Sequence, residues 1–350
     1  MENQISSGRG TLINPQNKFR NNFLGKFHKE GIDDFEFSLP RTVFINEYPK
    51  SIVSKNDSPD IPFDFSINPY QGCEHGCVYC YARESHQFWG YSAGLDFESK
   101  IIVKHNAPEL LEKTLLNPKW KVAPITFSGN TDCYQPAERK YKITRELLKI
   151  CLKYRNPVSI ITKNMLILRD IDILTELASR NLVHVVISVT TFNEELRRNL
   201  EPRSVTADKR LKTVKKLTEA GIPTGVMIAP IIPGLNINEV PLIIERAAEA
   251  GAFDVSHTVL RLNGAIEEIF INWLKAVYPE KAQKILTQVQ SIHGGKVNDS
   301  RFMKRMLGEG KIADMISQMM KIGRKRYFKN PGFPAFDTSK FRMGGMYTIW

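Results

Sequence analysis

The sequence lacks the features that mark several special classes of protein. It contains no run of about 18 apolar residues, so we expect no membrane-spanning helix. The first 30 residues are polar and carry no apolar signal-peptide core. No unit recurs at a fixed period, which argues against a repeat protein. The 350 residues, 42% of them hydrophobic, are enough for one barrel-sized domain plus tails.

Cysteine is also scarce, and this limits the kinds of site the chain can build. Three of the five cysteines lie in one short loop with the spacing Cys-x₃-Cys-x₂-Cys. This usage argues against a disulfide scaffold and favours a reducing, cytoplasmic location. Thiolates suit iron–sulfur clusters, zinc or copper(I). No second Cys-x₂-Cys pair completes a Cys₄ zinc site, so the zinc alternative would need His75 or His86 as its fourth ligand.

Negative charge is in deficit, because the formal net charge is +12. This balance favours a polyanionic partner, with nucleic acid first and an anionic membrane surface second. Basic residues gather in 139–155, 197–216, 301–305 and 321–329, and the aromatic loop 86–91 could stack on a base. The alternative is a generally basic protein whose outer helices carry Lys and Arg for solubility.

Short apolar runs alternate with amphipathic segments through the middle of the chain. The predicted strands are 65–70, 124–129, 158–162, 183–189, 225–229 and 255–260. The predicted helices are 107–116, 137–153, 170–179, 207–220, 238–250 and 265–277, with Asp170 and Asn238 as N-caps. Strand–helix alternation of this kind predicts βαβ units around a parallel sheet. The count fits an α/β fold with a partial (β/α)₆ TIM-type barrel better than a complete eightfold barrel.

The segments on either side of this pattern differ in composition. We divide the chain into an N-terminal arm and irregular lead-in (1–63), the (β/α)₆ core (64–278), a helical extension (279–328) and a C-terminal tail (329–350). The extension is predicted to hold helices 281–292 and 301–322. Residues 1–35 have the composition of a partly ordered leader, so we expect its basic side chains to be solvated.

The C-terminal tail carries Pro, Gly and aromatic residues without periodicity, which predicts extended or disordered chain. Its last residues, 346–350, could dock a partner. Equally, the tail could lie on its own domain.

An aromatic residue, Tyr79, precedes the third cysteine of the loop. The loop thereby resembles the radical S-adenosylmethionine (radical SAM) signature, Cys-x₃-Cys-x-aromatic-Cys. The resemblance implies that Cys73, Cys77 and Cys80 hold a 4Fe–4S cluster whose open iron is chelated by the methionine moiety of S-adenosylmethionine (SAM). Reduction then cleaves SAM to a 5′-deoxyadenosyl radical, and the electron comes from an external donor such as flavodoxin or ferredoxin. The cysteine loop follows the first predicted strand, at the edge of the barrel where chemistry gathers.

The segment after the second predicted strand resembles the superfamily's Gly-Gly-Glu-like contact to the SAM amine. Here it reads Gly129, Asn130, Thr131 and Asp132, with one Gly and a shorter acid. An ammonium group needs acceptors on a turn that allows the backbone to approach closely. An ordinary Asn/Asp turn is the alternative.

Later strand ends provide further cofactor candidates by the same resemblance. Lys163 could pair with the methionine carboxylate as a point charge, although a solvated Lys is the alternative. The hydroxyl of Ser188, and then Glu201 and Arg203, could contact the ribose or the carboxylate; a surface ion pair is the alternative for the last two. Ile228 lies on the strand that flanks the adenine, and any buried parallel strand would look the same.

More narrowly, the chain resembles the radical SAM branch described as DNA-repair-photolyase-like and related to spore photoproduct lyase. The segments that carry this resemblance are Asn68-Pro69-Tyr70-Gln71-Gly72-Cys73, Asn130-Thr131-Asp132-Cys133-Tyr134-Gln135-Pro136, Glu201-Pro202-Arg203 and Leu260-Arg261-Leu262.

This narrower resemblance implies a hydrogen-donating cysteine, for which Cys133 is the candidate, and a radical relay, for which Tyr81 is the candidate. Both could instead be packing residues. Arg261 could bind an anionic group at the barrel mouth. Three functions stay open: a radical SAM enzyme acting on nucleic acid, one acting on a protein, peptide or small metabolite, and a structural metal-binding protein.

Overall fold

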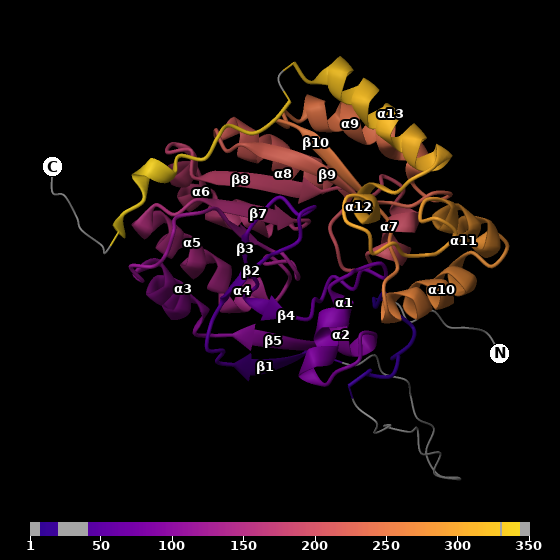
Figure 1. Ribbon diagram of the computed structural model, residues 1–350, viewed down its shortest axis with the longest axis horizontal. Helices are drawn as coiled ribbons and strands as arrows, with labels where there is room; N and C mark the ends of the chain where they lie inside the picture. Colours follow the sequence, from indigo (N-terminus) through magenta and orange to yellow (C-terminus); the bar gives the residue numbers. More distant parts are fainter. Residues whose placement is uncertain (1–7, 20–40, 330, 344–350) are drawn as a thin grey trace, which may run out of the picture.

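The computed structural model describes residues 8–19, 41–329 and 331–343 (Figure 1). Its strands are β1 (Val43–Glu47), β2 (Val53–Lys55), β3 (Phe65–Ile67), β4 (Tyr70–Gln71), β5 (Lys100–Lys104), β6 (Ile125–Phe127), β7 (Val158–Thr162), β8 (Val183–Ser188), β9 (Thr224–Ile231) and β10 (Val255–Val259).

The helices of the same described residues alternate with these strands and then continue alone. They are α1 (Arg83–His86), α2 (Leu95–Ser99), α3 (Ala107–Leu115), α4 (Glu138–Tyr141), α5 (Ile143–Tyr154), α6 (Ile171–Ala178), α7 (Glu194–Leu200), α8 (Ala207–Glu219), α9 (Val240–Glu249), α10 (Ala265–Val277), α11 (Ala282–Ser291), α12 (Lys304–Leu307) and α13 (Lys311–Tyr327).

The larger sheet has the strand order β10-β9-β8-β7-β6-β3-β2. All its neighbouring strands are parallel except β2 and β3, which are antiparallel. The six parallel strands correspond to the six predicted ones, so the α/β class and the partial barrel are confirmed. Central strands such as β8 are rich in Val and Ile because both faces of a parallel sheet are covered.

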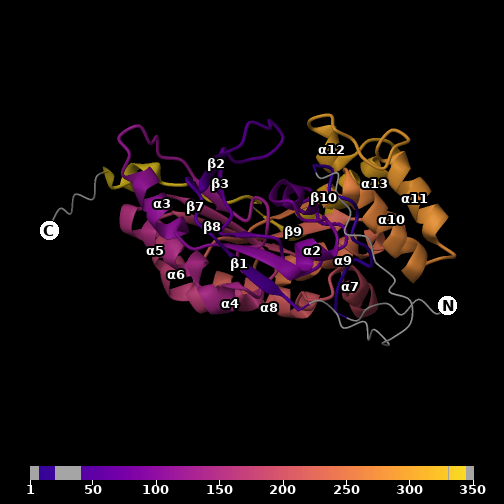
Figure 2. The same cartoon turned by 90° about the horizontal axis from the view of Figure 1, so that it is seen from below.

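Amphipathic helices cover the outer side of the parallel strands. Figure 2 shows α5, α6 and α8 along one side of the sheet. Helix α8 begins after Thr206, whose hydroxyl accepts a hydrogen bond from the Lys209 amide, and it buries Leu211 and Val214 against the core. Because these strands are parallel, their carboxyl ends lie together at one edge of the sheet.

A second, smaller sheet lies beside the first, with the order β1-β5-β4. The prediction of an irregular lead-in before residue 63 is therefore wrong for β1, and it is also wrong for β2, which pairs in the larger sheet. Strand β1 is half exposed over its five residues, so its sequence shows no clear apolar alternation.

Two predicted helices are interrupted where the backbone turns to positive φ. The predicted helix 301–322 is divided into α12 and α13 around Gly308 and Gly310, with φ of 76° and 85°. The predicted helix 137–153 breaks at Lys142, with φ of 55°. The predicted N-cap Asn238 lies inside a short 3₁₀ helix, and Glu239 takes the N-cap position of α9. Asp170 does precede α6, but its carboxylate binds side chains instead of capping the helix.

Residues 331–343, which we call the C-terminal strap, lie on the domain itself. Phe333 and Phe336 stack on His184 with ring centroids 4.6 and 3.8 Å away. The Asp337 amide donates to Asn181 O, and the Arg342 amide donates to Tyr154 O. These partners lie at or before the starts of β8 and β7, so the strap crosses the edge of the sheet opposite the cysteine loop (Figure 1). The proposed docking peptide 346–350 lies outside the described residues.

The described part of the arm, residues 8–19, packs against the cysteine loop. Arg9 is only 5% exposed, and its guanidinium donates to Glu98 O. The expectation that the basic residues of this segment are solvated is therefore wrong for Arg9. The boundaries at residues 63, 278 and 328 stay a prediction. No helix within the described ranges is both long and apolar enough to cross a membrane.

Candidate active site

The cysteine loop begins where β4 ends, beside the carboxyl edge of the parallel strands. Gly72 precedes the first cysteine with φ of 80°, and a Cβ there would lie 2.8 Å from Lys100 O. The Cys73 amide donates to Phe97 O at 2.9 Å. Short turns then bring Gly76 N to Cys73 O at 3.4 Å, which makes the loop compact. Only glycine fits a positive φ and such close backbone contact without strain.

The donor set of this loop fits an iron–sulfur cluster. The side chains of Cys73 and Cys77 are buried and Cys80 is half-buried, and none of the three forms a disulfide. Burial raises the pKa of Cys77 to about 11 and also raises the pKa of Cys73 and Cys80. A thiolate here therefore needs a positively charged partner, which bound iron provides. The loop thus supplies three soft ligands whose thiolate forms burial disfavours and whose deprotonation a bound metal would favour.

The two histidines of the zinc alternative are both buried, and within the described residues neither ring nitrogen of His86 has a hydrogen-bond partner. His75 Nδ1 lies 3.5 Å from an Asp132 oxygen, and burial lowers the His75 pKa to about 4. His86 packs against Tyr91 and Phe97. Within the described part of the chain, no group of three His, Cys, Asp or Glu side chains is arranged to hold one metal ion. This includes Cys73, Cys77 and Cys80, each of which would bind a different iron of a cluster.

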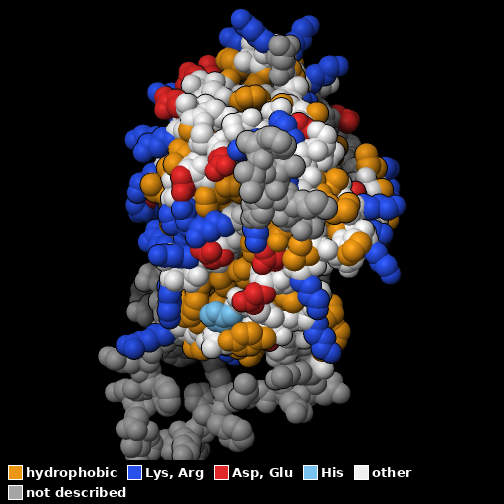
Figure 3. Space-filling view, turned by 90° about the vertical axis from the view of Figure 1, so that its left-hand side faces the viewer, with side chains coloured by type: hydrophobic (Ala, Val, Ile, Leu, Met, Phe, Trp, Pro, Cys, Tyr) orange, Lys and Arg blue, Asp and Glu red, His pale blue; other side chains and the backbone are white. Residues whose placement is uncertain are grey.

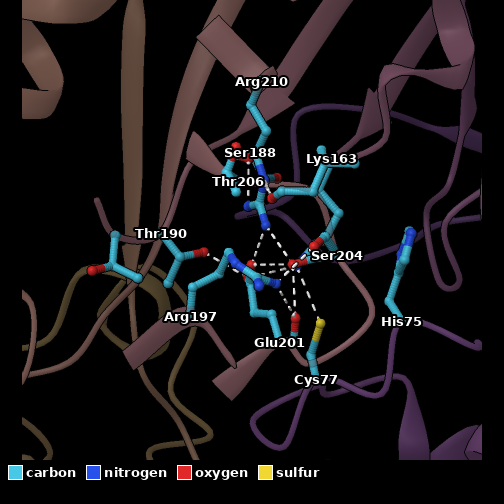
Figure 4. Close-up of polar contacts among 12 residues, drawn as sticks. His75, Cys77, Lys163, Ser188, Thr190, Arg197, Glu201, Ser204, Thr206 and Arg210 are labelled. Carbon is cyan, nitrogen blue, oxygen red and sulfur yellow. Dashed lines mark hydrogen bonds and ion pairs between the residues drawn. The ribbon is translucent and has the colours of Figure 1, made fainter. Parts of the chain in front are cut away.

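A buried network of charges lies next to the cysteine loop, centred on Glu201 (Figure 4). Lys163 Nζ is 3.0 Å from Glu201 Oε1 and 3.4 Å from Cys77 Sγ. Arg210 pairs with the other carboxylate oxygen, and Tyr79 donates its hydroxyl to Glu201. Elements far apart in sequence, the cysteine loop, β7 and α8, therefore meet at one carboxylate.

Charge pairing in this network outweighs the effect of burial. Burial alone would raise the pKa of Glu201, but Arg210 and Lys163 hold it well below its ordinary value. Burial would likewise lower the pKa of Lys163, whereas Cys77 and Glu201 raise it. Both groups are thus charged at neutral pH, as a partner for a zwitterionic ligand must be.

The predicted amine-binding segment does lie at this edge, after β6, but its side chains are already hydrogen-bonded. Asn130 Nδ2 donates to Gln71 and Ser85, and Thr131 Oγ1 donates to Tyr70 O. Asp132 accepts from Thr162 Oγ1 and from the Lys163 amide. Gly129 O accepts the hydroxyl of Tyr81 at 2.9 Å. These bonds fix the turn, and the role of the segment toward SAM stays a prediction.

The other predicted cofactor residues are spread along the same edge. Ser188 ends β8, and its carbonyl accepts from Arg210. The Arg203 amide donates to His75 O, and its guanidinium is 3.8 Å from Glu74. Ile228 is fully buried in the main core. The structure thus brings Lys163, Glu201 and Arg203 to the cysteine loop and leaves Ile228 inside the sheet.

The two predicted radical-transfer residues lie in different environments. Tyr81 is 47% exposed, and Arg261 lies over its ring with 5.9 Å to the centroid. Cys133 is fully buried in the main hydrophobic core, where its amide donates to Ser128 Oγ. Tyr81 is thus open to a substrate, whereas Cys133 packs among core side chains.

Sequence reasoning missed Arg210 as a member of the charged network, and it considered the Thr190 hydroxyl only as a contact to the ribose or the carboxylate. Thr190 Oγ1 donates to Glu201 Oε1 at 2.7 Å. Arg210 stood within a run of basic residues and looked like part of a solvated face. A signal was present, because Arg210 occupies the apolar stripe of α8 between Ala207 and Val214. A charge on the buried stripe of a helix requires a buried partner.

Comparison with other proteins places this geometry in a known family. The family model for the Radical SAM superfamily matches residues 67–247, just over half of the chain. An uncharacterized protein of Mycobacterium tuberculosis is 33% identical over 234 residues, which cover 66% of this chain and 69% of that protein. An uncharacterized protein of Methanocaldococcus jannaschii is 34% identical over 221 residues, which cover 63% of this chain and 79% of that protein.

Solved structures show the same fold at low sequence identity. Spore photoproduct lyase complexed with dinucleoside spore photoproduct aligns with a TM-score of 0.61 and 14% identity, covering 84% of this chain and 82% of that chain. A mutant of that lyase with bound AdoMet and the same dinucleoside aligns with a TM-score of 0.57 and 14% identity over the same shares. The family implies SAM and an iron–sulfur cluster. The chain belongs to the radical SAM superfamily and is an enzyme.

Proposed function

We propose that this enzyme holds a 4Fe–4S cluster through Cys73, Cys77 and Cys80 and reductively cleaves SAM, for the repair or modification of nucleic acid. The observation that carries the first part is the placement of three cysteines on one loop, two of them buried and one half-buried, beside the buried charged pair Lys163–Glu201. When bound, the cluster supplies the electron that cleaves SAM to methionine and a 5′-deoxyadenosyl radical. The electron itself would come from an external donor such as flavodoxin or ferredoxin.

The residues around the cysteine loop have separate tasks in this proposal. Lys163 pairs with the methionine carboxylate, because its ammonium already lies 3.4 Å from a cluster cysteine. Glu201 keeps Lys163 oriented and charged through an ion pair of 3.0 Å. The Gly129–Asp132 turn offers backbone acceptors to the amine, and Ser188 and Arg203 line the same edge. Tyr79 anchors the loop by donating to Glu201.

Support for nucleic acid as the substrate comes from the barrel mouth and the net charge. The fold is shared with a lyase solved in complex with a dinucleoside photoproduct. Tyr81 is exposed beside Arg261, and Phe88 is exposed on the aromatic loop. Exposed rings with a nearby cation suit a base that has been taken out of its stack.

A second candidate, a protein, peptide or small-metabolite substrate, is favoured by the way much of the positive charge is used. Arg210 is buried in the Glu201 network, and Arg305 pairs with Asp60. Figure 3 shows Lys and Arg side chains around the margin of the face over α3, α5 and α6, with acidic side chains among them. Cations used in this way contribute little to a phosphate-binding surface.

The decisive experiment for the chemistry is anaerobic reconstitution with iron and sulfide, reduction with dithionite, and assay of 5′-deoxyadenosine formed from SAM. We expect product from the wild-type protein and none from Cys80→Ala. A wild-type protein that binds iron and sulfide but never yields 5′-deoxyadenosine would refute the proposal.

The substrate class is tested by binding DNA and RNA, damaged and undamaged, across a range of salt concentrations. A nucleic-acid substrate predicts affinity that falls linearly with the logarithm of salt concentration. Weak binding without this dependence would favour the second candidate.

Roles for Tyr81 and Cys133 in radical transfer are tested once a substrate is known. Cys133→Ala should keep its cluster and change the product distribution, and Tyr81→Phe should do the same if the hydroxyl relays the radical. An unchanged product pattern would leave Cys133 as a packing residue.

A further inference from the structure

The arm segment, residues 8–19, touches the cysteine loop at a point where two backbones meet. A Cβ added to Gly10 would lie 1.6 Å from Gly76 O and 3.2 Å from Val78 Cγ1. Gly76 also lies close to its neighbours, because a Cβ added to it would lie 2.8 Å from Glu98 Oε2 and 3.3 Å from Gly10 N. The absence of side chains at both glycines allows the arm segment to lie directly on the loop that carries the cysteines.

Glu98 holds the arm segment at this position. Its carboxylate is fully buried and accepts from the Gly10 amide at 2.9 Å and the Thr11 amide at 3.0 Å. Arg9 donates to the Glu98 carbonyl from the same side. The two backbone amides bind the carboxylate at one defined position of the arm segment. A buried carboxylate without such donors would be destabilising.

The Glu98 carboxylate is also connected to the cysteine loop, through Arg83. Arg83 NH2 lies 2.6 Å from Glu98 Oε1, and both side chains are fully buried. Arg83 Nε donates to Cys77 O at 2.9 Å, while its NH1 donates to Ala93 O and Gly94 O at 3.0 Å. A hydrogen-bonded chain thus runs from Gly10 and Thr11 through Glu98 and Arg83 to the backbone of a predicted cluster ligand.

Further contacts attach the rest of the segment to the loop between α1 and α2. Ser92 Oγ donates to Pro15 O at 2.6 Å. Asn17 Nδ2 donates to Gln87 O at 2.9 Å and to Tyr91 O at 2.8 Å. The segment is therefore held along its length, independently of the Gly10 contact.

We propose that the arm segment is a positioning element of the cluster site: it fixes the cysteine loop through Glu98 and Arg83 and covers its outer face. The proposal rests on the cluster-binding function proposed above, and it assigns to residues about 60 positions before the first cysteine a part in holding the ligands. Gly10, Glu98 and Arg83 act through the loop backbone and touch no reacting atom.

The test compares cysteine reactivity in the metal-free, full-length protein, so it does not depend on a loaded cluster. The variant Gly10→Val places a side chain against Gly76 O without backbone strain, since the φ of Gly10 is negative or extended. Alkylation followed by mass spectrometry should show Cys73, Cys77 and Cys80 reacting about tenfold faster than in the wild type. The buried Cys133 and Cys151 should remain as slow as in the wild type.

Two further variants separate local positioning from general destabilisation. Gly221→Ala strains a turn with φ of 77° and no atom within 4 Å of the new Cβ, so it lowers stability far from the loop. Gly221→Ala should leave the relative alkylation rates of the five cysteines unchanged. The double variant Asn17→Ala/Ser92→Ala detaches the segment without a clash, and about a threefold rise at the three loop cysteines is expected. If neither Gly10→Val nor the double variant exposes the loop cysteines selectively, the proposal is wrong.

Reconstitution then distinguishes this proposal from the proposed function. A wild-type protein that takes up iron and sulfide, beside a folded Gly10→Val protein that takes up markedly less or bleaches faster in air, supports both. A wild-type protein that takes up no cluster refutes the function, while the labelling contrast still decides whether the segment positions the loop. Equal cluster content and equal bleaching in both proteins would overturn the positioning role.

Discussion

The two edges of the parallel sheet are each covered by one end of the chain, and the two covers differ in their chemistry. At the carboxyl edge, the arm segment meets the cysteine loop through backbone amides, a buried carboxylate and paired glycines. At the amino edge, the C-terminal strap is held by aromatic stacking on His184, by a hydrogen bond between His184 Nε2 and Pro334 O, and by single backbone hydrogen bonds.

This difference separates positioning from stability. Directional contacts to a buried carboxylate fix atoms within narrow limits, because each donor must point at its acceptor. Aromatic stacking tolerates small shifts and mainly removes apolar surface from water. We therefore expect changes at the carboxyl edge to alter the cluster site and changes at the amino edge to alter only the free energy of unfolding.

The largest expected effect is at the cluster ligands. Cys73→Ala, Cys77→Ala and Cys80→Ala should each abolish cluster binding, because a thiolate cannot be replaced by a methyl group. Iron and sulfide analysis after reconstitution measures this. The matched control is Cys151→Ala, since Cys151 is buried on α5 within the main core. Loss of the cluster in Cys151→Ala alone would contradict the assignment.

The next effect concerns the buried charge beside the loop. Glu201→Gln leaves Arg210 and Lys163 buried without a counter-charge, so we expect a loss of about 3–5 kcal/mol in the free energy of unfolding. Urea denaturation measures it. Glu219→Gln, at the exposed end of α8, removes an ion pair with Lys215 and should cost less than about 0.5 kcal/mol. Similar losses in the free energy of unfolding for Glu201→Gln and Glu219→Gln would show that the Glu201 ion pairs contribute no more to stability than an exposed pair.

A smaller effect is expected at the strap. Phe336→Ala removes a ring stacked 3.8 Å from His184 and should lower the free energy of unfolding by about 1–2 kcal/mol. Cluster content should be unchanged, because the strap lies at the opposite edge. A Phe336→Ala protein with normal stability but less cluster would break the comparison between the two edges.

A separate prediction concerns the pH dependence of stability at the same place. Burial lowers the pKa of His184 from 6.5 to about 4, although a hydrogen bond with Pro334 O opposes this. As pH falls from 6.5 toward 4, the unfolded chain binds a proton at this position before the folded chain does, so stability falls through that window. The contribution of His184 is measured by thermal unfolding of the wild type and His184→Gln at a series of pH values between 6.5 and 4. If the stability of both proteins falls equally with pH, the prediction is wrong.

Much of the fold was predictable because its signals are local. Strand β7 matches the predicted range 158–162, and the six parallel strands follow from apolar runs that alternate with amphipathic helices. The strands β1 and β5 were missed because they pair in a small separate sheet, outside the strand–helix repeat. The α12–α13 break was missed because it depends on two glycines that a helical pattern does not exclude.

The candidate site was predictable to a different degree. The cysteine spacing predicted three metal ligands, which stay a prediction, and the ends of successive strands pointed to Lys163 and Glu201, which the structure brings beside that loop. The sequence did not indicate Arg210 or Glu98 as partners, because Arg210 stood in a basic run of a predicted helix and Glu98 lay outside every predicted element. Their burial follows from elements that meet only in the folded chain.

The sequence by itself determined the superfamily, the parallel sheet and the three cysteines, because each is encoded in residues that are close together along the chain. Only the tertiary structure decided which charges are buried, which terminal segment covers which edge, and that Cys133 lies in the core while Tyr81 is open. The physical reason is that a charge or thiol takes its properties from its surroundings, and these are supplied by residues far away in sequence, as Tyr79 and Glu201 are, 122 positions apart.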